Sequence, residues 1–296
     1  MKRWTLRAGL ALLLLSACAQ AEAPGPRRAL LWKISDADNS LYLLGSFHAL
    51  KPEDYPLPPA VEGAFAESEA LAFEVPPAEM ESPELAKQMM SAAILPDGKT
   101  LQSLLTPTAW HRLDLYCSKN GLKAQDMQRL APWFVSLMLS LREMQRLGFD
   151  PKLGLDRNLM ARAASANKPT SGLETAADQI GVLSGMALPT QLQLLDEALD
   201  EAENPHGNMD TLHEDWQRGD AKAIESAMVL QLRDKYRQLY QRINVDRNRA
   251  WLPKLEAMLD RHKRDDVLIV VGSLHLVGPD GLIEQLRAKG YTVQRL

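Results

Sequence analysis

Two apolar segments near opposite ends of the 296-residue chain stop at the same pattern, Gly-Ser-x-His. They are LYLLGSFHAL at residues 41–50 and LIVVGSLHLV at residues 268–277. A short continuous apolar run predicts a strand buried on both faces, as in a parallel sheet covered by helices. In such sheets ligands bind beyond the carboxyl ends of the strands. The repeated pattern therefore predicts that two imidazoles, those of His48 and His275, lie at one edge of an α/β sheet.

The remaining sequence alternates strand-like and helix-like segments, which predicts an α/β fold. We expect a mostly parallel or mixed central sheet with flanking helices, and a long helical middle region that forms an insertion or cap. The predicted strands are a hairpin at 30–34 and 40–45, short strands at 71–75 and 169–174, a buried strand at 264–273 and a final strand at 291–296. No change in composition divides residues 29–296, so we expect one domain there.

One predicted helix carries an apolar stripe that contains methionine. In the segment 127–148, apolar residues recur at helical spacing, namely Leu130, Phe134, Leu137, Leu141 and Met144. Such a stripe serves either a protein core or a groove for an apolar ligand, because methionine adapts to both. We expect core packing, since an apolar face at this spacing is typical of a helix in a globular protein.

The first seventeen residues predict a signal peptide. Three basic residues precede an apolar run, 8–15, that is too short to span a bilayer. The sequence LSAC resembles a bacterial lipobox, in which Cys18 carries the lipid anchor and residues 18–28 form a tether. The alternative is an ordinary secretory signal cut near residues 19–21. We therefore expect an exported outer-membrane lipoprotein that faces the periplasm, or else a soluble periplasmic or secreted protein.

The mature chain is expected to be acidic and to hold one unlipidated cysteine. Removing residues 1–17, which hold three basic and no acidic residues, takes the formal charge from −4 to −7. An acidic chain is a poor partner for nucleic acid, so we expect no such partner. Cys117 has no second cysteine with which to form an intrachain disulfide.

Common catalytic motifs are absent from the sequence. It contains no CxxC, no G-x-S-x-G, no Walker A motif and no GxGxxG. The pair His213–Glu214 continues as HEDWQ and so lacks the second histidine of a zinc-protease helix. We expect four histidines to be solvated or on helix surfaces, namely His111, His206, His213 and His262.

Two histidines need a carboxylate to complete a three-ligand metal site with an open position. Glu74 is the best candidate, because it lies in the apolar segment LAFEV, and a buried carboxylate needs a partner or a cation. Glu174, at the end of PTSGLE, is the second candidate. Asp156 and Arg157 in GLDRNL, and Arg247 in DRNRAW, are further polar groups that would line the same edge.

These segments together resemble the TraB/GumN family of exported bacterial proteins. The resemblance is carried by LLWKI…LYLLGSFH, PLP, the FEV strand, GLDRNL, KP…LE, DRN…W and VVGSLHLVGPDGLIEQLRAKGY, and it covers nearly the whole mature chain. The family belongs to a wider group with the Tiki metalloproteases and the TraB/PrgY pheromone-shutdown proteins. This chain has Ser after each motif glycine, where Thr or Ala is common.

The resemblance implies that His48, Glu74 and His275 are ligands of a divalent metal ion. Nitrogen and oxygen ligands fit Mn, Co or Zn, and the resemblance favours Mn or Co. It places Glu174 and Arg247 on recurring polar positions, and we expect them to act as general base and oxyanion stabiliser. The expected function is metal-dependent hydrolysis, with a peptide or other cell-envelope molecule as substrate. The alternative is a non-catalytic binding or regulatory lipoprotein that captures a peptide or a polysaccharide precursor.

Overall fold

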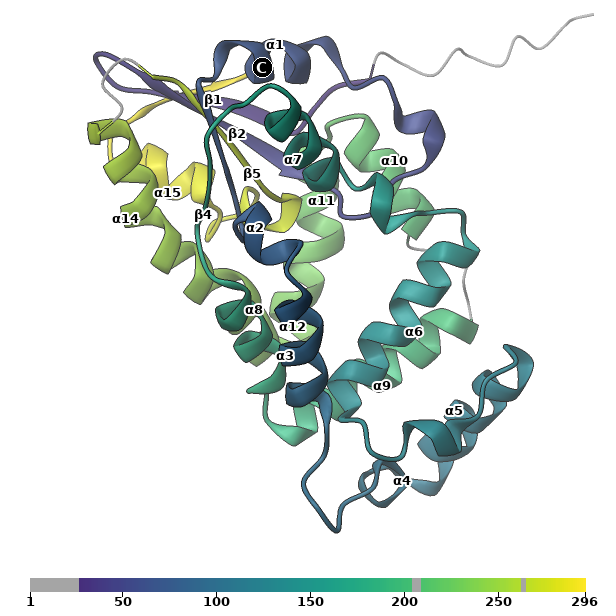
Figure 1. Ribbon diagram of the computed structural model, residues 1–296. Coiled ribbons are helices and arrows are strands. Elements are labelled where there is room, and N and C mark those ends of the chain that lie inside the picture. Colours follow the sequence, from purple (N-terminus) through teal and green to yellow (C-terminus); the bar gives the residue numbers. More distant parts are fainter. Residues whose placement is uncertain (1–26, 204–208, 262–264) are drawn as a thin grey trace, which may run out of the picture.

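The sheet of the protein is mixed and mostly parallel, as expected. Its strands are β1 (Leu31–Ser35), β2 (Ser40–Ser46), β3 (Ala70–Phe73), β4 (Thr170–Gly172), β5 (Val267–Gly272) and β6 (Thr292–Arg295). The computed structural model describes residues 27–203, 209–261 and 265–296, and within these the strand order is β4-β3-β5-β2-β1-β6 (Figure 1). β4, β3, β5 and β2 run parallel, whereas β1 is antiparallel to both of its neighbours.

The two apolar runs form the centre of this sheet. Every residue of β2 and of β5 is buried, and the two strands pair with each other in parallel. The β1–β2 hairpin turns at Asp36, whose Oδ1 accepts the amide hydrogens of Asp38 and Asn39. Such local side-chain bonds favour tight turns. The sequence between the two strands therefore fixes their pairing, and the apolar runs fix their burial.

Helices make up most of the rest of the described chain. They are α1 (Pro59–Glu67), α2 (Pro77–Met80), α3 (Pro83–Ala93), α4 (Leu101–Leu104), α5 (Pro107–Lys119), α6 (Pro132–Arg146), α7 (Leu155–Ser165), α8 (Ala176–Ser184), α9 (Leu188–Glu203), α10 (Met209–Gln217), α11 (Ala221–Ile224), α12 (Gln231–Lys235), α13 (Arg237–Tyr240), α14 (Asp246–Arg261) and α15 (Leu282–Ala288). Short 3₁₀ turns include η1 (Pro52–Asp54) and η6 (Ser273–His275). Ser82, Thr106 and Thr175 cap α3, α5 and α8 through side-chain oxygens that accept backbone amides.

The crossovers place helices on both faces of the sheet. Figure 1 shows α1 and α7 on one side of the strands and α14 and α15 on the other. The connections from β2 to β3 and from β3 to β4 both lead towards the β4 edge of the sheet. The connection from β4 to β5 leads back in the opposite direction. Crossover connections between parallel strands are right-handed. The helices in connections that lead in opposite directions therefore cover opposite faces of the sheet. The sheet is thus buried between two helical layers.

The helical middle region has a core of its own. One cluster of buried residues surrounds the sheet, and a second joins α3, α5, α6 and α9, with members such as Leu113, Val135, Leu139, Leu195 and Leu199. Cys117 is buried in this second cluster. The arrangement agrees with the expected helical insertion or cap.

The expected core role of the α6 stripe is wrong for part of it. Trp133, Val135 and Leu139 form the buried face of α6, and Ser136 donates to the Leu194 carbonyl of α9 at 3.0 Å. Leu141, from the predicted stripe, is instead 38% exposed. Apolar residues run around more than one face of α6, so spacing alone did not identify the face that packs.

The predicted signal peptide, Cys18 and residues 19–26 of the predicted tether lie outside the described residues. Among the helices that the structure does describe, none is both long and apolar enough to cross a membrane.

Candidate functional site

The histidines and glutamates predicted from the sequence lie together at one edge of the sheet. His48 follows β2, Glu74 follows β3, Glu174 follows β4 and His275 follows β5. Because these four strands are parallel neighbours, their carboxyl ends meet at the same edge. The pairing of β3 with β4 continues past the strands, since the Glu174 amide donates to the Glu74 carbonyl at 2.8 Å. The topology therefore brings together residues that are distant in sequence.

Gly272, the last residue of β5, allows the candidate ligands to approach one another. A Cβ atom on this residue would lie 3.2 Å from Oε1 of Glu74 and 3.3 Å from Nε2 of His48. It would lie 3.7 Å from Cδ2 of His275, whose Nε2 is 3.9 Å from the same Glu74 oxygen. The Gly272 amide donates to that oxygen at 2.7 Å. The three side chains thus converge on the space that glycine leaves open.

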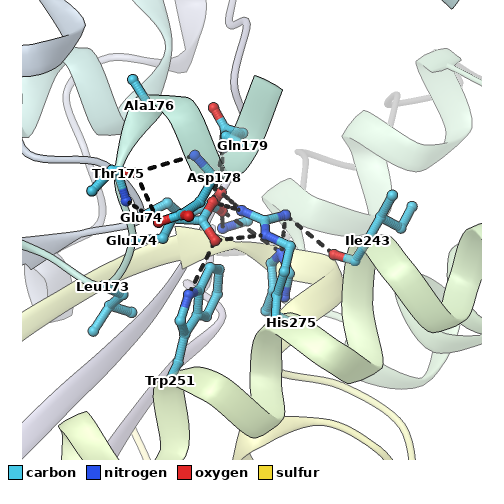
Figure 2. A network of polar contacts seen from close by, with 12 residues as sticks. Glu74, Leu173, Glu174, Thr175, Ala176, Asp178, Gln179, Ile243, Trp251 and His275 are labelled. Atoms are coloured by element: carbon cyan, nitrogen blue, oxygen red, sulfur yellow. Dashed lines mark hydrogen bonds and ion pairs between the residues drawn. The ribbon is translucent and has the colours of Figure 1, made fainter. Parts of the chain in front are cut away.

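Arg247, in the first turn of α14, links the two carboxylates to His275. Its Nη2 donates to Glu74 at 2.5 Å and to Glu174 at 2.7 Å, and its Nε donates to Glu174 at 3.1 Å. Its Nη1 lies 3.1 Å from Nε2 of His275. Figure 2 shows both carboxylates beside His275, and Trp251, which donates to Glu174 at 3.2 Å. A planar guanidinium suits this set because its donors form a rigid fork.

Each histidine has a polar neighbour at Nδ1. Nδ1 of His275 lies 2.7 Å from Oδ1 of Asn248. The Asn248 nitrogen donates to the carbonyls of His275 and Asp280, so its oxygen accepts from the imidazole. Nδ1 of His48 lies 3.5 Å from Oδ2 of Asp156. In metalloproteins, partners of this kind orient a ligating imidazole and leave its Nε2 for the metal. Here Nε2 of His275 lies against Nη1 of Arg247.

Burial and charge set the protonation of these groups. Burial alone would raise the pKa of Glu74, but Arg247 and the two imidazoles lower it to about 2. Burial raises the pKa of Glu174 above its ordinary value despite the bonds from Arg247. Burial also lowers the pKa of His275 to about 3, so this ring is neutral near pH 7.

His48 differs from His275 in its protonation. Desolvation opposes charge on its ring, yet the nearby Asp156 carboxylate raises the pKa of His48 to about 9. Its side chain is 62% exposed, so water also reaches the charged ring. Only a neutral imidazole binds a metal, so an ion and a proton would compete for His48.

The donor set fits a divalent cation. Imidazole nitrogens with one carboxylate are typical ligands of zinc and neighbouring transition metals in sites that keep an open position. As the described part of the chain is arranged, no three His, Cys, Asp or Glu side chains are grouped closely enough to hold an ion. The Arg247 guanidinium instead contacts the Glu74 carboxylate and Nε2 of His275, the atoms that would bind an ion. The space therefore already accommodates a cationic group.

The sequence did not single out three other polar residues of the site. Gln179, on α8, donates to Glu74 at 3.2 Å and lies 3.4 Å from Glu174. Asn248 and Trp251 come one and four residues after Arg247, so helical spacing from that arginine would have found them. Gln179 is distant from every motif, and nothing in its local sequence marks it.

His213 is not solvated, which corrects the expectation from its polar context. It is 5% exposed on α10, and its Nε2 lies 2.9 Å from Oδ2 of Asp54. Its ring packs edge-on against Phe149, with ring centroids 4.9 Å apart. Trp216, on the same face of α10, donates to the Gly45 carbonyl at 3.0 Å. α10 thus contacts the chain on both sides of His48.

Of the other three histidines, His111 alone lies in the described part of the chain. His111 is exposed on α5, as expected. His206 and His262 lie outside the described residues. Arg157 is exposed next to Asp156 and contributes to the wall of a cavity beside His48.

The fold and site define a class of α/β protein in which parallel strands bring two histidines and two glutamates to one sheet edge beside an arginine. Residues 30–295 match the model of the TraB/PrgY/gumN family, and the chain belongs to that family.

Curated relatives cover most of the chain at low identity. The uncharacterized protein YbaP of Escherichia coli (strain K12) is 26% identical over 248 residues, which are 83% of this chain and 87% of YbaP. A metalloprotease TIKI homolog of Amphimedon queenslandica is 24% identical over 317 residues, covering 90% of this chain and 61% of that protein. No solved structure was found to match the chain.

Proposed function

We propose that this protein is a metal-dependent hydrolase of the bacterial cell envelope, and that its substrates are peptides. The observation that carries the proposal is the convergence of His48, Glu74 and His275 on the space beside Gly272. The similarity to a metalloprotease TIKI homolog supports peptide hydrolysis. Nε2 of each histidine and a carboxylate oxygen of Glu74 would hold the ion, which we expect to be Mn, Co or Zn.

The residues around this centre have complementary roles in the proposed reaction. A divalent ion bound there would acidify the attacking water and polarise the scissile carbonyl. Glu174 would accept the proton of that water, and the raised pKa of its buried carboxyl suits it to hold a proton. Arg247 would donate to the carbonyl oxygen as negative charge develops there. Asp156 and Asn248 would keep the imidazoles oriented.

Metal analysis of the purified protein tests the proposal. The full chain, prepared without chelator and then incubated with Mn, Co or Zn, is expected to retain about one ion per molecule. His48→Ala, Glu74→Ala and His275→Ala should each lose it, whereas His111→Ala, at an exposed position, should not. A peptide-library cleavage assay on the loaded protein then tests hydrolysis. A wild-type protein that takes up none of the three metals would rule the proposal out.

One observation favours a second function. Arg247 contacts acceptors of Glu74, Glu174 and His275, and the Gly272 amide, Gln179 and Trp251 donate to the two carboxylates as well. The edge thus has a polar network that needs no ion. In this alternative the protein is a binding or regulatory envelope lipoprotein that captures a peptide or a polysaccharide precursor. Stoichiometric binding of such a ligand by metal-free protein, without turnover after metal loading, would favour this function over hydrolysis.

We further propose that the protein is exported and held at the outer membrane through a lipid on Cys18, facing the periplasm. The support is the lipobox-like sequence LSAC after a short apolar run. Cys18→Ser should move the protein from the membrane fraction to the soluble fraction. Unchanged partitioning would contradict the anchor.

A further inference from the structure

Two apolar cavities extend from the candidate metal centre. One has a volume of about 490 Å³ and the other about 410 Å³. Both are lined by Ser46, His48, Glu74, Met144 and Gln179, so they meet at the reacting groups. Cavities of this size are typical of sites that bury a small ligand or several side chains of a larger one. The two form the arms of one cleft.

The walls of each arm are mainly aliphatic. The first arm, between the ends of β2 and β5 and the helical region, includes Leu183, Leu212, Met228, Ile243 and Leu274. The second arm, beside the end of β3, includes Met80, Leu137, Leu141 and Met160. Methionine recurs in both arms and adapts its shape to different partners. Ser46, His48, Glu74 and Gln179 are the polar residues that both arms share, whereas Arg247 lines only the first arm and Asp156 and Arg157 only the second. Apolar walls with a few polar groups are expected of a specific binding cleft.

α6 contributes to this cleft a face that the helical core uses only in part, since Leu137 also packs against the second cluster. Leu137, Leu141 and Met144 line the second arm, and Met144 lines both. Val135 and Leu139, which belong to the buried cluster with α9, lie elsewhere on the helix. A helix with two apolar faces buries one against its neighbour and leaves the other for a ligand. The methionine-containing stripe is thus partly a ligand-facing surface.

We propose that the cleft binds an extended peptide segment that carries large apolar side chains on both sides of the bond at the metal centre. This inference depends on the proposed peptidase function. Two apolar arms that meet at the reacting groups fit a chain that passes through the cleft and places side chains in each arm. A polysaccharide would leave its hydroxyl groups against aliphatic walls without hydrogen-bond partners. The occupant is therefore an apolar stretch of polypeptide.

Matched peptides and a matched pair of variants on α6 test the inference. One peptide carries Leu or Phe on both sides of the cleaved bond, and its partner carries Asn or Ser there. The kcat/KM of the Mn-loaded wild type should be at least about 10-fold higher for the apolar peptide than for the polar peptide. Met144→Gln, which keeps side-chain length but adds an amide, should lower kcat/KM for the apolar peptide by roughly 10-fold. Met138→Gln should leave it unchanged, since Met138 is 37% exposed on the same helix and lines neither arm.

Binding measurements separate this inference from the proposed function. Fluorescently labelled versions of both peptides are titrated with metal-free protein, and thermal unfolding confirms that both variants fold. One outcome is that metal-free protein binds the apolar peptide selectively, that Met144→Gln weakens this binding, and that Mn loading produces no cleavage. This outcome supports the cleft assignment and rules out the proposed hydrolase function. Equal cleavage of both peptides supports the hydrolase and overturns the cleft assignment. Binding of a free fatty acid but of neither peptide also overturns it.

Discussion

Replacing Gly272 with alanine changes the candidate metal centre by a single methyl group. That methyl would lie 3.2 Å from Glu74 and 3.3 Å from His48, inside the space on which the ligands converge. Gly272→Ala should therefore weaken metal binding by about 10-fold or more, the effect typical of displaced metal ligands or their neighbours. Isothermal titration with Mn would measure this change. Gly63→Ala on α1 is the control, because a Cβ there contacts nothing within 4 Å and helical alanine is favoured over glycine. If Gly272→Ala and Gly63→Ala bound Mn with equal affinity, the assignment of the metal site to the space beside Gly272 would be wrong.

The guanidinium of Arg247 makes contacts that a lysine ammonium cannot reproduce. Three of its nitrogens contact Glu74, Glu174 and His275. Arg247→Lys keeps the charge but loses the fork, so kcat for peptide cleavage should fall about 100-fold with a smaller change in KM. Arg249→Lys, whose side chain is 76% exposed, should behave as wild type. If both variants retained full kcat, Arg247 would have no part in the reaction.

The sequence predicts the strongly constrained residues of the site better than the supporting ones. His48 and His275 each follow an apolar run that ends in Gly-Ser, and Glu74 is a carboxylate next to an apolar strand, so the local sequence makes each of them conspicuous. Asp156 is expected from the sequence to line this edge, but its place beside Nδ1 of His48 arises only through tertiary packing. Gln179 is similar, since its partners Glu74 and Glu174 come from other strands. Such residues depend on long-range geometry that local sequence does not encode.

At the level of elements, α10 holds the segment that carries His48. His213 is buried with Asp54 of η1, and Trp216 of the same helix contacts the end of β2. His213→Ala removes one hydrogen-bond partner of the buried Asp54 carboxylate, so the free energy of unfolding should drop by roughly 1–3 kcal/mol. Urea unfolding measures the loss, and His111→Ala, at an exposed position of α5, should change it by less than about 0.5 kcal/mol. Equal stability of the two variants would show that the buried pair contributes nothing.

The strands could be predicted from the sequence more completely than the packing faces of the helices. The positions of β1, β2, β3 and β5 follow from apolar runs, and the β1–β2 hairpin follows from its Asp-rich turn. β4 and β6 are short and largely exposed, yet they lie within the segments predicted as strands. A strand buried on both faces needs no choice of face, whereas a helix must select one. On α6, Val135 and Leu139 pack in the helical core while Leu141 and Met144 face the cleft. The burial of His213 could not be predicted for the same reason. α10 carries polar residues on more than one side, so its sequence does not show which side packs.

At the scale of the whole molecule, the candidate metal centre forms only when the sheet has assembled. The bond between Gly272 and Glu74 joins residues 198 positions apart, and His48 arrives on a third strand. An unfolded chain therefore holds no comparable set of ligands, and an ion that binds only the folded state stabilises it. At an Mn concentration of about 100 times Kd, this linkage is worth about 2.7 kcal/mol. For a domain of this size that corresponds to a rise in Tm of roughly 5–10 °C.

Differential scanning fluorimetry with Mn and then with excess EDTA measures this linkage in the full chain. The wild type should show the rise, and EDTA should reverse it. In Glu74→Gln, the side-chain amide oxygen can still accept from the Gly272 amide, but the negative charge of the carboxylate is lost. The Tm of this variant should therefore not respond to Mn. Gly63→Ala should respond as the wild type does, because Gly63 lies on α1 with open space around it. A rise of equal size in wild type and Glu74→Gln would place the ion elsewhere on the molecule, and the sheet edge would then be a binding surface without a metal.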